Sequence, residues 1–169
     1  MRGRGLRTAR WLGVGLLLLP AGCYQSDRPL GPPQKGAIDT KLVGTWRCLA
    51  TGDKPEESAA LWVRPFDDTQ YVVEWRDPDD VAHYRAYATS VGGETLLNLR
   101  ELTSERAGEG WEFIRYRLEK DGRLRVWIVD DKAVGGLKGA PALSAIKKRV
   151  ADDSLYHDLM TCQPQEKEP

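Results

Sequence analysis

The chain has 169 residues, of which 25 are basic and 25 acidic, so its formal net charge is zero. The first 22 residues contain four arginines and no acidic residue, so the 147 residues that follow carry an excess of four negative charges. A mildly acidic chain of this size fits one domain and argues against nucleic acid as a partner, because phosphate backbones are bound by clustered basic residues.

The N-terminal segment 1–22 has the three parts of a secretory signal. A basic stretch, residues 1–10, precedes the short apolar run 11–19, and small residues follow immediately before Cys23. The apolar run is shorter than the about 20 residues that a membrane-spanning helix needs, which disfavours the alternative of a permanent membrane helix. We therefore expect residues 1–22 to be a signal peptide that is removed.

The stretch Leu19-Pro20-Ala21-Gly22-Cys23 resembles the lipobox of bacterial lipoproteins. The resemblance implies that Cys23 becomes the first residue and carries diacylglyceryl and fatty-acyl chains such as palmitate, which anchor the chain to a membrane. Pro20 stands where the family usually has leucine, and ordinary cleavage with Cys23 left as a thiol is the alternative. Tyr24, instead of the aspartate that retains such proteins at the inner membrane, implies the periplasmic side of the outer membrane if the cell is Gram-negative.

Composition divides the remaining chain into three parts. Residues 23–37 hold three prolines and two glycines and are predicted to be a flexible tether. Residues 38–162 form the predicted domain, and residues 163–169 are a polar tail. Apart from Cys23, the chain has only Cys48 and Cys162, which in an oxidising compartment most simply form a disulfide; two unrelated buried thiols are the alternative.

Alternating apolar and polar residues predict a mainly β fold. Strand-like stretches cover residues 46–50, 60–66, 70–75, 83–91, 95–102, 111–119 and 123–130. Tight turns separate most of them, Asp121-Gly122 being the strongest turn signal. The pattern then changes to helical spacing from Lys138 onward, and a second short helix is expected near Asp153 or Ser154, with Leu155, Leu159 and Met160 on its buried face. We expect an antiparallel meander or small barrel with one or two C-terminal helices.

The segment 38–46, which ends in Gly44-Thr45-Trp46, looks like the start of a lipocalin-type barrel. In that family a helical turn leads into the first strand through Gly-x-Trp, and the tryptophan closes the barrel floor. The resemblance implies this role for Gly44 and Trp46. The predicted strands are one or two fewer than eight, so a full lipocalin barrel and a smaller or incomplete one stay open.

No grouping of residues predicts catalysis. His83 and His157 lie in no metal-binding spacing, and no metal or cofactor is expected. Ser154, His157 and Asp158 are close in sequence but lack the elbow motif that exposes a nucleophilic serine. We therefore expect a protein that is not an enzyme.

Aromatic side chains are the remaining candidates for a binding site. If the barrel is hollow, they could line an apolar cavity; if it is filled, they form its core. The candidates are Trp62, Tyr71, Trp75, Tyr84, Trp111, Tyr116 and Trp127. The leading hypothesis is a membrane-anchored envelope lipoprotein that binds a small apolar ligand. The alternative is an envelope assembly factor or inhibitor that acts on another envelope protein through its outer surface.

Overall fold

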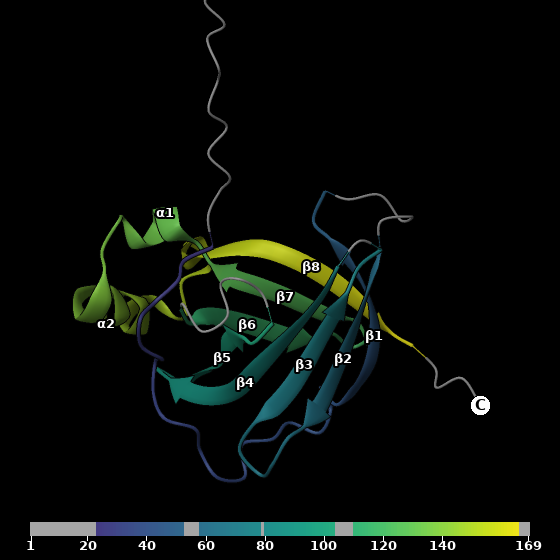
Figure 1. Ribbon diagram of the computed structural model, residues 1–169. Coiled ribbons are helices and arrows are strands. Elements are labelled where there is room, and N and C mark those ends of the chain that lie inside the picture. The colour runs from purple at the N-terminus through teal and green to yellow at the C-terminus, as the bar shows by residue number, and fades with distance from the viewer. Residues whose placement is uncertain (1–22, 53–57, 79, 104–109, 166–169) are drawn as a thin grey trace, which may run out of the picture.

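The computed structural model describes residues 23–52, 58–78, 80–103 and 110–165, which form a closed antiparallel barrel with helices to one side (Figure 1). Each strand pairs with the next along the chain, and the last pairs with the first. The elements are β1 (Gly44–Ala50), β2 (Ala59–Pro65), β3 (Tyr71–Arg76), β4 (Val81–Val91), β5 (Glu94–Glu101), β6 (Glu112–Leu118), β7 (Leu124–Val129), α1 (Asp131–Val134), α2 (Gly139–Arg149), a 3₁₀ helix (Asp153–Leu155) and β8 (Tyr156–Pro164). The expected mainly β fold is confirmed, and the barrel has eight strands, consistent with the lipocalin-type resemblance.

The sharp turns lie where glycine permits them. Between β6 and β7, Gly122 has a φ of 84°, and the N–H of Glu119 donates to the carbonyl of Arg123 at 2.8 Å. A residue with a Cβ rarely adopts such a φ, so glycine is required at this position. Asp121-Gly122 therefore forms the turn that the sequence predicts.

The predicted second C-terminal helix is wrong, because only one 3₁₀ turn forms before strand β8. The start signal is real: the carboxylate of Asp152 accepts a hydrogen bond from the Ser154 N–H at 2.9 Å. Beyond that turn, the edges of β7 and β1 offer unpaired backbone groups, and β8 satisfies both. A bulge opposite Val126 and Trp127 lets the neighbouring Leu159 and Met160 both contact the interior, which explains the misleading helical spacing.

A disulfide joins Cys48 and Cys162, as the sequence predicts. The two cysteines are directly opposite each other on β1 and β8, with their Cα atoms 3.9 Å apart. The bond therefore fastens the seam at which the first and last strands close the barrel.

The apolar residues form two separate clusters, one inside the barrel and one outside it. The inner cluster includes Trp46, Tyr71 and Ile114. The outer cluster lies between the outer face of β5 to β7 and the helices, and α2 contributes Leu143 and Ile146 to it. The predicted helix after Lys138 is thus confirmed as α2.

Residues 23–31, which we name the strap, differ from the flexible tether that their composition predicts. Tyr24 and Leu30 are at most 2 % exposed and belong to the outer cluster. The Leu30 N–H donates to the buried Asn98 Oδ1 at 2.7 Å. A Cβ on Gly31 would lie 2.9 Å from the Thr89 methyl group, so the strap passes very close to β4. The strap forms no helix or strand beyond two isolated bridges, at Cys23 and Ser26, but its apolar side chains still pack against the barrel.

Candidate functional site

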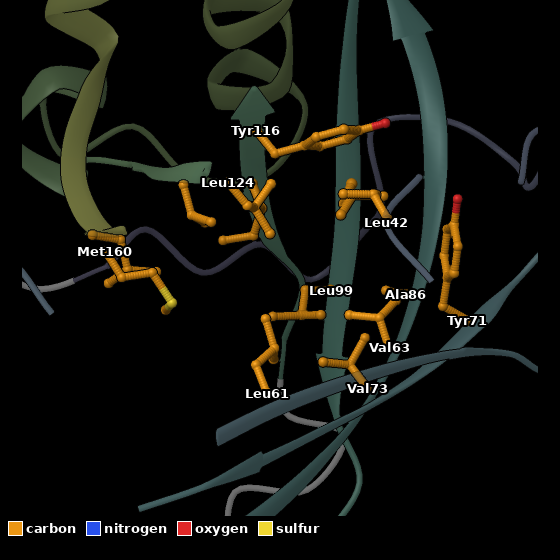
Figure 2. Close-up of a pocket in the computed structure, with 14 residues that line it drawn as sticks. Leu42, Leu61, Val63, Tyr71, Val73, Ala86, Leu99, Tyr116, Leu124 and Met160 are labelled. Atoms are coloured by element: carbon orange, nitrogen blue, oxygen red, sulfur yellow. The ribbon is translucent and has the colours of Figure 1, made fainter. Parts of the chain in front are cut away.

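An apolar cavity of about 100 Å³ lies within the barrel. Inward-facing side chains from all strands except β1 surround it, together with Leu42 (Figure 2). The lining consists of Leu42, Leu61, Val63, Tyr71, Val73, Ala86, Leu97, Leu99, Ile114, Tyr116, Leu124, Val126, Leu159 and Met160. Alternation along each strand sends every second side chain inward, which is why aliphatic residues dominate this list.

The floor of the barrel is formed by the turn that precedes β1. The N–H of Leu42 donates to the carbonyl of Asp39 at 3.1 Å, which closes one turn of chain. The indole N–H of Trp46 donates back to the Leu42 carbonyl at 3.0 Å, and Trp46 is only 5 % exposed. Gly44, at a φ of 156°, joins the turn to the strand. These contacts fit the floor-closing role that the lipocalin resemblance implies for Gly44 and Trp46.

Two tyrosine hydroxyls connect the floor turn to the barrel wall. The Tyr71 hydroxyl accepts from the N–H of Asp39 at 2.6 Å, and the Tyr116 hydroxyl donates to the carboxylate of Asp39 at 3.2 Å. Burial raises the pKa of Tyr71, and burial together with the charge of Asp39 raises that of Tyr116. Both phenols therefore stay neutral, and their polar ends are occupied by the floor. A ligand in the cavity would therefore make apolar contacts and no hydrogen bond to these two hydroxyls.

The seven aromatic residues predicted as ligand-lining divide into three groups. Tyr71 and Tyr116 line the cavity. Trp75 and Tyr84 pack against the inner cluster without being among the lining residues, and burial, aided by the Glu101 charge, raises the pKa of Tyr84 to about 12. The remaining three contact groups on the outer face: Trp62, Trp111 and Trp127.

The sequence-based prediction names only aromatic residues, whereas most of the residues that line the cavity are aliphatic. Leu61, Val63 and Val73 were visible as alternating residues of predicted strands, but a shift by one residue exchanges the two faces of a strand. Leu42 lies in the floor turn, outside every predicted strand. The floor motif was the signal that could have located it.

The end of the barrel opposite the floor carries an inward-facing carboxylate. Glu112 alternates with Ile114 and Tyr116 along β6, and burial raises its pKa, with the charge of Glu101 acting in the same direction. The side-chain amide of Gln25, in the strap, donates to Glu112 at 3.2 Å. The strap thus contacts the rim of this end.

Cys23 lies at the same end, beside the last residue of β7. Its thiol is free and exposed, and its backbone forms a bridge with Asp130. The next residue, Tyr24, donates its N–H to the carbonyl of Val129 at 3.1 Å. Cys23 therefore sits directly on the barrel wall, with no slack chain between it and the domain.

The residues weighed for catalysis are not assembled into a site. The Ser154 hydroxyl donates to Asp152 at 2.6 Å. His83 lies 3.4 Å from a carboxylate oxygen of Glu74, and His157 is an exposed residue of β8. Within the described ranges, no cluster of three or more histidine, cysteine or acidic residues could hold a metal ion.

Comparisons with protein-family models, curated proteins and solved structures find no match to this chain. Its function must therefore be argued from its own residues. Among the helices of the described part of the chain, none is long and apolar enough to cross a membrane.

Proposed function

We propose that this protein is an envelope lipoprotein, anchored through acyl chains on Cys23, that binds a small apolar ligand inside its barrel. The observation that carries the ligand proposal is the cavity of about 100 Å³ with an aliphatic lining. An apolar cavity does not hold water well, and an engineered protein cavity of about 150 Å³ binds benzene or xenon. The expected ligand is a compact apolar molecule or the end of an alkyl chain.

A pair of matched substitutions tests the ligand proposal. Ala86 is fully buried and lines the cavity, so Ala86→Leu places an isobutyl group in the space that a ligand would occupy. Ala60 alternates with the inward-facing Leu61 on β2, so Ala60→Leu adds the same group on the outer face. The probes are benzene and xenon, followed by NMR on the methyl groups of Leu99 and Ile114.

We expect the unsubstituted chain and Ala60→Leu to take up both probes, and Ala86→Leu to lose the response while keeping its fold. Native mass spectrometry of the protein from its own envelope then seeks a co-purified ligand. If the unsubstituted chain takes up neither probe and carries no bound molecule, the ligand proposal fails.

The anchoring proposal rests on the lipobox resemblance and on the exposure of Cys23. Its test is metabolic labelling with palmitate in a bacterial host. The label should enter the full chain and be absent from Cys23→Ser, which should also leave the membrane fraction. Equal labelling of the two chains, or an unmodified thiol at Cys23 by mass spectrometry, would refute it.

The alternative of an assembly factor or inhibitor stays a prediction. Among the described residues, the large apolar side chains that are exposed belong to five separate segments of the chain: Val43, Phe66, Val81, Leu102 and Leu137. Phe66 is moreover covered by the guanidinium of Arg85 at 3.7 Å from the ring centre. The ligand proposal, by contrast, rests on a defined cavity with named lining residues.

A further inference from the structure

A groove of about 320 Å³ runs along the outer face of β6, β7 and β8. We name it the arginine groove. It is lined by Arg115, Arg117, Arg125, Trp127, Tyr156 and two aspartates. Strand register brings the cations together, because Arg115 is opposite Trp127, and Arg117 is directly opposite Arg125.

Three guanidinium groups surround one indole ring. Their central carbons lie 5.0, 5.8 and 5.0 Å from the Trp127 ring centre for Arg115, Arg117 and Arg125. Arg115 also lies 4.0 Å from the Tyr156 ring centre. Aromatic faces attract cations, but like charges directly opposite on neighbouring strands repel each other. The groove therefore concentrates positive charge that an anion would relieve.

The arginines are only partly paired. Arg115 contacts a carboxylate oxygen of Asp153 at 2.9 Å, and Arg125 contacts Asp158 at 3.2 Å. Arg117 is exposed and, within the described ranges, has no carboxylate in salt-bridge distance. The Arg115 side chain is only 10 % exposed, and its Nε has no hydrogen-bond partner. Arg115 therefore keeps one unused donor for a further acceptor, while Asp158 Oδ1 in the same groove is an acceptor without a partner among the described residues.

Asp153 marks where that acceptor would bind. This aspartate side chain is 89 % exposed, so it can turn away into solvent and release Arg115. A tetrahedral anion with several oxygens could then accept hydrogen bonds from Arg115, Arg117 and Arg125 together. Planar guanidinium groups bind phosphate in two-point geometry better than lysine does, and several of them suit a group with more than one negative charge.

We propose that the arginine groove binds a phosphate group. Two sources share this chemistry, a phospholipid headgroup and a free or soluble phosphate. Trp127 precedes Asp130, the bridge partner of Cys23, by three residues of extended chain, roughly 10 Å. If the proposed acylation holds, phospholipid headgroups beside the anchor lie within reach of the groove. The headgroup as source rests on the proposed function, whereas a soluble phosphate as source does not.

The test uses the full chain carrying Cys23→Ser, which cannot be acylated, so that its outcome does not depend on the anchor. The first arm titrates inorganic phosphate at constant ionic strength and follows the indole N–H of Trp127 by NMR. The second arm measures binding to phosphatidylcholine vesicles with and without phosphatidylglycerol. Arg117→Gln and Arg125→Gln are the test variants. Arg64→Gln removes the same charge from an exposed position on β2, away from the groove.

We expect phosphate to shift the Trp127 signal, and each test variant to weaken binding about tenfold, as loss of a charge-assisted hydrogen bond does. Arg64→Gln should bind as the parent does. Vesicle binding that needs phosphatidylglycerol and is lost in Arg117→Gln supports the headgroup as source, whereas phosphate binding without vesicle binding supports a soluble phosphate. No response in either arm, or an equal loss in Arg64→Gln, would overturn the proposal. Failed acylation or an empty cavity would leave these results unchanged.

Discussion

The packing of the strap gives the sharpest stability prediction, the effect of Tyr24→Ala. The Tyr24 side chain is fully buried, and its ring lies 6.1 Å from that of Phe113, between ring centres. A buried aromatic side chain removes roughly 150 Å² or more from water, which at about 25 cal/mol per Å² is about 4 kcal/mol. Core substitutions of large aromatic residues by alanine cost about 3–5 kcal/mol. We therefore expect Tyr24→Ala to lower the unfolding free energy by about 3–4 kcal/mol. The loss cannot exceed the free energy needed to detach the strap from the barrel, because beyond that point the strap detaches while the barrel stays folded.

Urea unfolding, followed by tryptophan fluorescence in the Cys23→Ser chain, measures this loss. The matched control is Arg28→Ala, which removes a side chain that is 72 % exposed in the same strap and should change the unfolding free energy by less than about 0.5 kcal/mol. Limited proteolysis should cut within residues 23–37 faster in Tyr24→Ala than in the control. If Tyr24→Ala is as stable as the parent, the strap is a free tether and the reasoning is refuted.

Three further predictions concern the Cys48–Cys162 disulfide, the Glu112 carboxylate and the hydrogen bond between Leu30 and Asn98. The disulfide closes a separation of 114 residues, so its reduction should cost about 4–5 kcal/mol in the chain-entropy model, seen as a lower urea midpoint; an unchanged midpoint would contradict this. Burial raises the pKa of Glu112, so its contribution to stability is present below the ordinary value of 4.5 and is lost as pH rises through the raised value. Glu112→Gln should therefore stabilise the fold at pH 7, with a gain that shrinks in acid, whereas a gain that does not depend on pH would contradict this cause. Asn98→Ala leaves the buried N–H of Leu30 without its acceptor, which should cost about 2 kcal/mol or more and increase amide exchange in the strap.

Much of the barrel could be predicted because each hairpin carries its own local signals. Strands β2 to β7 show period-two alternation, and Asp121-Gly122 specifies a turn by backbone conformation alone. The disulfide followed from counting, since only Cys48 and Cys162 remain once Cys23 is assigned elsewhere. These features depend on neighbours in sequence, or on so few candidates that only one pairing exists.

The features that could not be predicted depend on contacts distant in sequence. Strand β8 exists because closure of the sheet leaves two edges to fill, and its bulge makes Leu159 and Met160 resemble a helix face. The strap is ordered by Asn98 and Phe113, residues about seventy or more positions away. No local pattern in the strap shows that such partners exist.

The strap also relates the proposed anchor to the orientation of the barrel. Because the Tyr24 N–H is bonded to Val129, only Cys23 itself separates an acyl group from the end of β7. One residue spans at most about 3.6 Å, so the lipid could not let the domain turn freely. The floor turn with Trp46 lies at the start of β1, at the end of the barrel opposite to Cys23. Acylation at Cys23 would therefore hold the Glu112 end at the membrane and direct the floor away from it, with the arginine groove running along the adjoining wall of β6 to β8.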